Sequence, residues 1–309
     1  MTTKASILIQ ARLAAASLIA LALFSAATAG ATAVVIQADF GGAVMPGVVY
    51  GVSSELDIFT IQPLIPLYDI DAASRSLAYT APYWPAGTVF VSVVDPGVGT
   101  PRKSVVLKTR SGHYFVSPDN GSLTDVAENL GIEAVREIDE SVNRLKGSER
   151  SHTFHGRDVY SYTAARLAAG VIGYDQVGPL LAPQVVRLER PEATLKDGVV
   201  SGTIASSGGR FGNVSSNIKN TLFDQLGVRE GEIVIVTIRN RGELVWEQEV
   251  PYVRTFGAVP LGEPLLFVNS SYFLSLAINQ GQFAAVHQIG SGPDWRIEIR
   301  AKPAPAPSP

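Results

Sequence analysis

The sequence contains no cysteine, and this absence excludes several kinds of chemistry at once. A chain without thiols has no disulfide framework, no thiolate nucleophile and no cysteine-based zinc or iron-sulfur site. Basic residues are also sparse, with no run longer than the pair Arg102 and Lys103, and the formal net charge is −3. Because nucleic-acid binding depends on a concentrated positive field, we do not expect nucleic acid as a partner.

Long hydrophobic runs are equally scarce. The main one covers residues 13–24, follows the basic residues Lys4 and Arg12, and precedes Ala27-Thr28-Ala29. This order of a basic start, an apolar centre and a small-x-small site is typical of a secretory signal peptide. We therefore predict that residues 1–29 are a cleaved signal peptide and that the protein is exported, to the periplasm or outside the cell. An uncleaved anchor is the alternative, but the run is shorter than the roughly 20 residues of a membrane span.

The remaining composition is that of a globular protein. With 309 residues, 46% of them hydrophobic and 17% charged, the chain can bury a sizeable core and is long enough for two domains. In the first part, short apolar runs alternate with helical patterns. Strands are predicted at 33–36, 57–61, 89–94, 105–109 and 114–117, and helices at 47–54, 72–81 and 123–129. This alternation predicts an N-terminal α/β sheet domain spanning residues 30–190.

The pattern changes from about residue 199, where strands separated by glycine-rich turns follow one another with few helical periods. Strands are predicted at 199–205, 233–239, 244–250 and 295–300. We therefore predict a smaller, mainly β C-terminal domain covering residues 191–301. Residues 302–309 are rich in proline, which can neither pair as a strand nor continue a helix, and are predicted to be a disordered tail.

Four short motifs place an ionisable residue beside glycine or proline where strands meet loops. They are Asp39-Phe40-Gly41, the sequence VDPGVGTPR at 94–102, Pro118-Asp119-Asn120-Gly121, and the sequence TFHGRD at 153–158. Each motif alone is weak, since Asp-Pro-Gly and Pro-Asp-Asn-Gly, for example, are common turn signals. In this order, within about 120 residues, they resemble the S-adenosylmethionine hydroxide adenosyltransferases, which are related to enzymes that make 5′-halogenated adenosines.

The resemblance continues into the second domain and covers roughly residues 34–300. It is carried there by Phe211-Gly212-Asn213-Val214, Asn269-Ser270 and Asn279-Gln280-Gly281. It implies cleavage of S-adenosylmethionine by water to adenosine and methionine, through displacement at the 5′ carbon, with no cofactor and no metal. It also implies a homotrimer, with each site between the first domain of one subunit and the second domain of the next.

The resemblance assigns a water-handling trio to Asp95, Arg102 and His155. Arg102 would stabilise hydroxide character on the attacking water, while His155 and Asp95 would orient this water and accept or relay its proton. The halogenating relatives lack the trio, so its presence favours hydrolysis. Taken singly, the three residues are also compatible with a turn cap, a surface charge and a satisfied core histidine.

Substrate binding is assigned by the same resemblance to Asp39, Phe40, Asn213, Phe256, Ser270 and Asn279. Asp39 matches the carboxylate that accepts hydrogen bonds from the ribose hydroxyls, although a helix N-cap is an alternative role. Asn213 matches a residue near the adenosine, and Phe256 lies where an aromatic ring covers the base. A phenylalanine in a β domain is also commonly a core residue.

The resemblance is weakest at the methionine end of the substrate. Residues 42–46 read GAVMP, where family members carry polar or acidic residues, and Ser271 replaces an arginine of the halogenating relatives. Two alternatives follow, a hydrolase of another 5′-substituted adenosine and a non-catalytic nucleoside-binding protein. A third alternative is a metal-dependent hydrolase that uses His152, His155 and Asp158.

Overall fold

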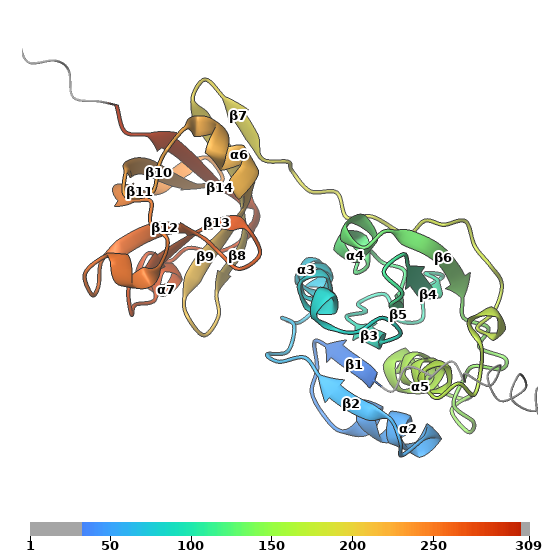
Figure 1. Cartoon of the computed structure of the whole chain (residues 1–309). Coiled ribbons are helices and arrows are strands. Elements are labelled where there is room, and N and C mark those ends of the chain that lie inside the picture. The colour runs from blue at the N-terminus through green and yellow to red at the C-terminus, as the bar shows by residue number, and fades with distance from the viewer. Residues whose placement is uncertain (1–32, 304–309) are drawn as a thin grey trace, which may run out of the picture. The chain divides into compact units, whose positions relative to one another are not determined.

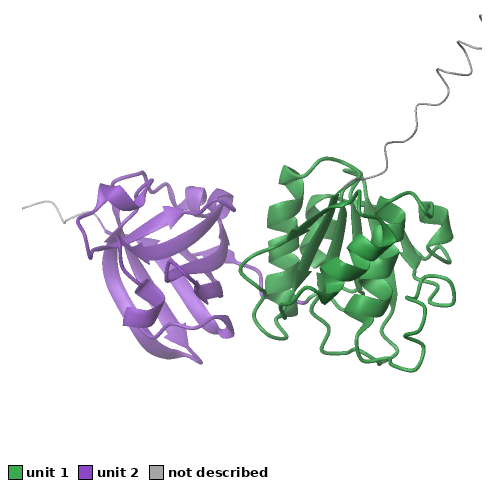
Figure 2. Ribbon diagram, turned by 90° about the horizontal axis from the view of Figure 1, so that it is seen from below, with its two compact units in different colours: residues 1–188 green, residues 189–309 purple. Residues whose placement is uncertain are grey.

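The computed structural model describes residues 33–303. The chain divides into two compact units, residues 1–188 and 189–309 (Figure 2); the sequence prediction places the division between residues 190 and 191. The predicted signal peptide and residues 304–309 of the predicted tail lie outside the described residues. Within residues 33–303, no helix has the length and apolar character needed to cross a membrane.

The first unit is built on a six-stranded sheet with the strand order β2-β1-β3-β5-β4-β6. Its strands are β1 (Ala33–Ala38), β2 (Asp57–Thr60), β3 (Val89–Val93), β4 (Ser104–Thr109), β5 (Tyr114–Pro118) and β6 (Ile132–Glu137). Its longer helices are α2 (Val44–Val52), α3 (Ile70–Thr80), α4 (Thr124–Asn129) and α5 (Tyr162–Ala168), with short turns η1 (Ala81–Tyr83), η2 (Gly156–Ser161) and η3 (Tyr174–Gln176). The strand pairs β1/β2, β1/β3 and β3/β5 are parallel, whereas β4 runs antiparallel to both of its neighbours.

Side chains alternate across this sheet and fill two separate cores. Val34 and Ile36 of β1 pack in one core with residues of α2 and α5, whereas Val35 between them packs in the other with residues of α3 and α4. Figure 1 shows α2 and α5 on one face of the sheet and α3 and α4 on the other. Because both faces are covered, the strands read as nearly continuous apolar runs, which is why the sequence revealed them.

Two aspartates leave the same edge of the sheet. Asp39 follows β1 and Asp95 follows β3 after one residue, and the ends of these parallel strands are paired through Ala38 and Val93. Open α/β sheets bind ligands at the carboxyl ends of their strands. The topology therefore places both predicted site aspartates at the edge where a ligand is expected.

The second unit is an antiparallel sheet with the order β11-β10-β14-β8-β9-β13-β12, and β7 pairs with β8. Its strands are β7 (Thr194–Lys196), β8 (Val199–Gly208), β9 (Asn213–Lys219), β10 (Ile233–Asn240), β11 (Glu243–Pro251), β12 (Pro264–Val268), β13 (Phe273–Ile278) and β14 (Gly292–Ala301). Short helices are α6 (Asn220–Phe223), η4 (Asp224–Leu226), η5 (Phe256–Ala258) and α7 (Phe283–Val286). Val253 after β11 donates its N–H to the carbonyl oxygen of Leu266 in β12, which joins the two ends of the sheet.

The α/β first domain and mainly β second domain expected from the sequence are thus confirmed. Strands β6, β7, β9, β12 and β13 and helices α5, α6 and α7 were not predicted from the sequence.

Candidate active site

The loop between β3 and β4 folds back so that Asp95 near its start meets Arg102 near its end. Arg102 Nε donates to Asp95 Oδ1 at 2.9 Å, and its Nη2 donates to Oδ2 at 2.5 Å. Both side chains are nearly buried, with Asp95 6% and Arg102 10% exposed. Arg102 Nη1 donates to Ser104 Oγ at 3.1 Å. The bidentate ion pair with Asp95 and the hydrogen bond to Ser104 together fix the plane of the guanidinium group.

His155 completes the trio from a distant part of the chain. Its Nδ1 lies 3.0 Å from Arg102 Nη2. A guanidinium group only donates hydrogen bonds, so Nδ1 must be the acceptor and the neutral ring must carry its hydrogen on Nε2. Nε2 is buried and has no hydrogen-bond partner among the described residues. The structure therefore brings the three predicted residues together, and the neutral ring of His155 presents its Nε2 hydrogen as a donor. The predicted roles of the three residues in handling the water stay predictions.

The charges in the trio follow from burial and pairing. Burial lowers the pKa of His155, opposed by the negative charge of Glu140 and assisted by the positive charges of Arg102 and Arg144. Burial, the largest single cause, lowers the pKa of Arg102, but the hydrogen bond to Asp95 together with the charges of Tyr160, Asp95 and Glu140 outweighs it, and the net pKa is raised. At neutral pH, the site therefore holds a permanently charged guanidinium beside a neutral imidazole.

Tight packing behind His155 fixes its backbone against the sheet. The next residue is Gly156, where a Cβ atom would lie 3.0 Å from Val93 Cγ1 and 3.2 Å from Met45 Sδ. A side chain at this position would displace the chain from β3. Gly156 also begins η2, which is wound as a π-helix. Tyr160 of η2 is buried and shares Ser104 with Arg102, through contacts of 3.2 Å and 3.1 Å.

A cavity of about 330 Å³ lies at the carboxyl end of β1. Its described lining carries no charged side chain and consists of Ile36, Ala38, Phe40, Gly41, Gly42, Val44, Met45, Pro46, Thr60, Gln62, Leu64 and Phe154. The rings of Phe40 and Phe154 meet edge to face at 5.5 Å, which connects the segment of Asp39 with that of His155. Asp39 Oδ2 accepts a hydrogen bond of 2.8 Å from the backbone N–H of Tyr68. The volume is at the small end of the range for ligand sites.

Four predicted substrate-binding residues belong to the second unit. Asn213 opens β9 and is half-buried, and Ser270 is exposed in the turn between β12 and β13. Phe256 is 39% exposed and packs on Phe267 with 4.9 Å between ring centroids. Asn279 is buried, and its Nδ2 donates to the carbonyl oxygen of Val259 at 2.8 Å, which leaves its amide oxygen for a ligand. Their substrate contacts stay predictions.

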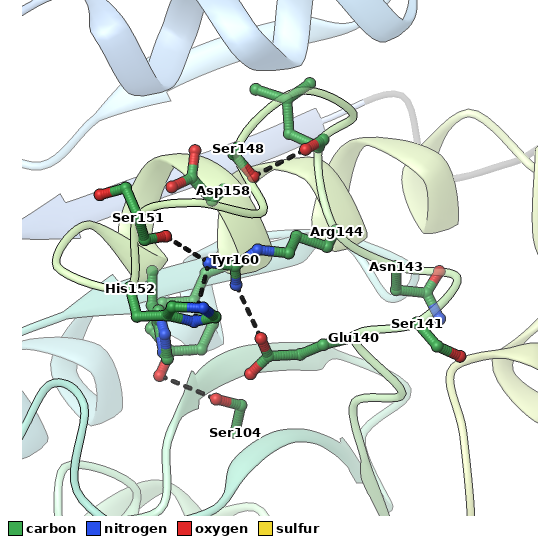
Figure 3. Close-up of polar contacts among 12 residues, drawn as sticks. Ser104, Glu140, Ser141, Asn143, Arg144, Ser148, Ser151, His152, Asp158 and Tyr160 are labelled. Carbon is green, nitrogen blue, oxygen red and sulfur yellow. Dashed lines mark hydrogen bonds and ion pairs between the residues drawn. The ribbon is translucent and has the colours of Figure 1, made fainter.

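A second polar cluster is centred on Arg144 (Figure 3), and it approaches the trio at His155. Arg144 Nη1 donates to Glu140 Oε2 at 2.7 Å, and Nη2 donates to the Ser151 carbonyl oxygen at 2.6 Å and lies 3.3 Å from His152 Nδ1. One carboxylate oxygen of Glu140 and one ring nitrogen each of His152 and His155 lie within 4.8 Å of one another. Glu140 and Arg144 were not predicted as site residues from the sequence, in which their only signal is their i, i+4 spacing.

The metal site considered from the sequence does not form with its predicted ligands. Asp158 is fully buried and binds Arg157 Nε at 2.6 Å, and Glu140 takes its place beside the two histidines. A metal ligand needs a free lone pair, but the neutral His155 ring uses its lone pair at Nδ1 to accept from Arg102 and carries a hydrogen at Nε2. These donors therefore do not suit a metal ion.

Comparison with known proteins identifies the family from both units. A family model described as the SAM hydroxide adenosyltransferase N-terminal domain matches residues 34–178, and the model of the C-terminal domain matches residues 202–296. The chain belongs to the SAM hydroxide adenosyltransferase family. Asp39, Asp95, Arg102 and His155 all fall within the N-terminal match, and Asn213 falls within the C-terminal match.

Relatives in the SAM hydroxide adenosyltransferase family carry two kinds of name. A Salinispora tropica protein named (R)-S-adenosyl-L-methionine hydrolase is 35% identical over 261 residues, which cover 82% of this chain and 90% of that protein. A Methanocaldococcus jannaschii protein of the same name is 31% identical over 225 residues, which cover 73% of this chain and 76% of that protein. An Actinoplanes protein named fluorinase is 28% identical over 250 residues, which cover 73% and 82%.

The fold of this family member is also seen in solved structures. A crystal structure of an uncharacterised conserved protein from Thermotoga maritima aligns with a TM-score of 0.77 and 34% identity, over 86% of this chain and 99% of that one.

Proposed function

We propose that this chain is an enzyme that hydrolyses S-adenosylmethionine to adenosine and methionine by attack of water on the 5′ carbon. The observation that supports it most directly is the assembled trio of Asp95, Arg102 and His155, with the Nε2 hydrogen of His155 left for an incoming group. Relatives named as hydrolases of this substrate reach 35% identity. No cofactor is needed, because the sulfonium group of the substrate is itself a good leaving group.

The trio suits this displacement electrostatically. The sulfonium loses its positive charge as hydroxide character develops on the water, so a poorly solvated site with one fixed cation favours the transition state. Arg102 supplies that cation, and Asp95 holds it in one orientation. His155 donates from Nε2 to the oxygen of the water and aims it at the 5′ carbon.

The substrate would be held by both units. Asp39 is proposed to accept hydrogen bonds from the ribose hydroxyls, beside Phe40, while Asn213, Phe256, Ser270 and Asn279 contribute from the second unit. We also propose the homotrimer, with sites completed by neighbouring subunits, and export to the periplasm or beyond through a signal peptide at residues 1–29.

A second candidate substrate is supported by the cavity beside Asp39. Val44 and Pro46 line it, and none of its described lining residues is charged. Burying an ammonium or a carboxylate group without a partner costs more than the roughly 2–7 kcal/mol of an unpaired neutral polar group. Hydrolysis of an adenosine with a different, uncharged 5′ substituent is therefore the alternative.

The test is direct turnover. Incubation of the purified protein with S-adenosylmethionine should yield adenosine and methionine in equal amounts by chromatography. His155→Ala should lower the rate by about 100-fold or more, because it removes the group that holds the water. His287→Ala, which changes a half-buried histidine of the second unit, is the matched control and should keep the wild-type rate. A wild type that binds adenosine in calorimetry but turns over no substrate would point to a nucleoside-binding protein.

A further inference from the structure

No member of the trio can take the proton that hydrolysis releases without disrupting the ion pair that holds the trio together. Both carboxylate oxygens of Asp95 are bonded to Arg102, so a proton on Asp95 would remove the negative charge that pairs with this buried guanidinium, and Arg102 itself can only donate. His155 uses its lone pair at Nδ1 to accept from Arg102 and presents a hydrogen at Nε2. The trio can therefore bind and orient a water, but its proton must go elsewhere.

The neighbouring cluster contains one group of the right kind. Arg144 binds Glu140 Oε2, and no hydrogen bond within residues 33–303 reaches the other oxygen, Oε1. His152 faces Arg144 through Nδ1, so this ring, like that of His155, carries its hydrogen on Nε2. Two imidazole donors thus accompany one carboxylate oxygen that is open to accept. Glu140 is the only member of the cluster that can take a proton without losing an existing contact.

The spacing of the cluster fits a single water molecule. Its three ligand-type atoms lie within 4.8 Å of one another. A water that makes two hydrogen bonds of about 2.8 Å at a tetrahedral angle joins groups about 4.6 Å apart. A water at this spacing can therefore bridge a histidine ring nitrogen and a carboxylate oxygen of Glu140.

We propose that Glu140 is the catalytic base of the hydrolysis, a role that rests on the function proposed above. As the oxygen of the water bonds to the 5′ carbon, the bond from that carbon to sulfur breaks and its electron pair goes to sulfur. One O–H bond of the water breaks, and its proton goes to Glu140 Oε1. The products are the 5′ hydroxyl of adenosine, the thioether of methionine and a protonated Glu140, so no other reactant is required.

The position of Glu140 also provides a route for the proton to leave. His155 is 7% exposed, whereas the Glu140 side chain is 36% exposed and His152 is exposed. Figure 3 shows Glu140 and His152 both directed toward Arg144 from the loop segments that follow β6 and precede η2. A proton that reaches Glu140 can therefore pass to solvent, and the base is regenerated for the next turnover.

Substitution of the carboxylate tests this assignment. Glu140→Gln keeps the size of the side chain and an oxygen for Arg144, and should lower kcat about 100-fold with little change in KM, because general-base contributions are of this size. Glu133→Gln is the matched control, since Glu133 is also a carboxylate of this region in an ion pair, with Lys108. It should keep a kcat within about twofold of the wild type, as expected for an exposed pair.

Chemical rescue separates catalysis from support of Arg144. In Glu140→Ala, added formate should restore kcat in proportion to its concentration, because a small carboxylate can occupy the vacated position. A wild-type rate in Glu140→Gln, or a slow Glu140→Ala that formate does not accelerate, would overturn the assignment and leave hydrolysis itself standing. A wild type without turnover would overturn both proposals.

Discussion

Two small clusters, each made of a carboxylate, an arginine and a histidine, lie side by side in the first domain. We call Asp95, Arg102 and His155 the inner unit, and Glu140, Arg144 and His152 the outer unit. In each, an arginine binds a carboxylate and donates toward a histidine Nδ1. They differ in burial, since the inner carboxylate is 6% exposed and the outer one 36%. They also differ in hydrogen bonding, because both oxygens of Asp95 accept from Arg102, whereas only Oε2 of Glu140 accepts from Arg144.

The difference shows that burial can give the same kinds of residue two different roles. Inside the protein, a fully bonded carboxylate keeps the arginine and the imidazole in one geometry and one charge state. Near solvent, the same arrangement leaves an oxygen that can exchange protons with water. We therefore expect changes to the arginine and the histidine of the inner unit to affect the rate far more than matched changes to those of the outer unit, whose carboxylate is the proposed base.

The sharpest way to test that contrast is the same substitution in both units. Arg102→Lys removes the planar fork that contacts Asp95 and His155 together, and a lysine cannot replace it with one point charge. We expect kcat/KM to fall about 1,000-fold, at the upper end of the range for loss of one preorganised hydrogen-bond donor. Arg144→Lys should cost about tenfold or less. Equal losses in steady-state assays would show that the two units are not functionally distinct.

The pH dependence tests the inner unit alone. Because burial lowers the pKa of His155 below its ordinary value of 6.5, the neutral ring persists at neutral pH. Protonation at lower pH removes the Nδ1 acceptor and places a second positive charge beside Arg102. The value of kcat/KM should therefore be constant around pH 7 and fall only below pH 6.5.

Stability should change in the same direction, through linkage. The unfolded chain binds the proton more readily than the folded one, so this histidine makes the free energy of unfolding smaller as pH falls below 6.5. Denaturant unfolding of the wild type and of His155→Gln across this range measures the effect. A decline in activity that begins above pH 7 would contradict the neutral, buried histidine.

The smallest effect is expected at the outer histidine. His152→Ala removes one exposed donor, whose net contribution of about 1 kcal/mol corresponds to a rate loss below tenfold.

Activity of this variant and of the wild type should also be unchanged by a chelator. Loss of wild-type activity in chelator, with recovery on adding zinc, would restore the metal-dependent alternative.

The sequence predicts the inner unit but not the outer one, and the reason is physical. Asp95, Arg102 and His155 lie next to a glycine or a proline in two short motifs whose order carries the family resemblance, and the strand before the first of these motifs, β3, is buried. Glu140 and Arg144 lie in a segment without such a motif. Charged residues there have the pattern of an ordinary solvent-exposed loop. Only the folded chain reveals that this loop returns to His155.

Missed strands have a related cause. In β9 and β13, polar residues such as Ser215 and Ser275 form cross-strand hydrogen bonds inside the sheet, at 2.7 Å between their hydroxyl oxygens. Such residues interrupt the apolar pattern that indicates a strand. Strands β1 and β3 of the first domain were easier to read because most of their residues are apolar.

The π-wound segment η2 adds a constraint on how this protein can vary. It ends where α5 begins, and α5 is held in place by its packing on the sheet. Deleting one residue between Gly156 and Ser161 would restore ordinary winding, and the lost residue corresponds to about 100° of rotation about the helix axis. Since α5 cannot turn, His155 would have to swing away from Arg102. Insertions and deletions here should therefore be far less acceptable than amino-acid replacements.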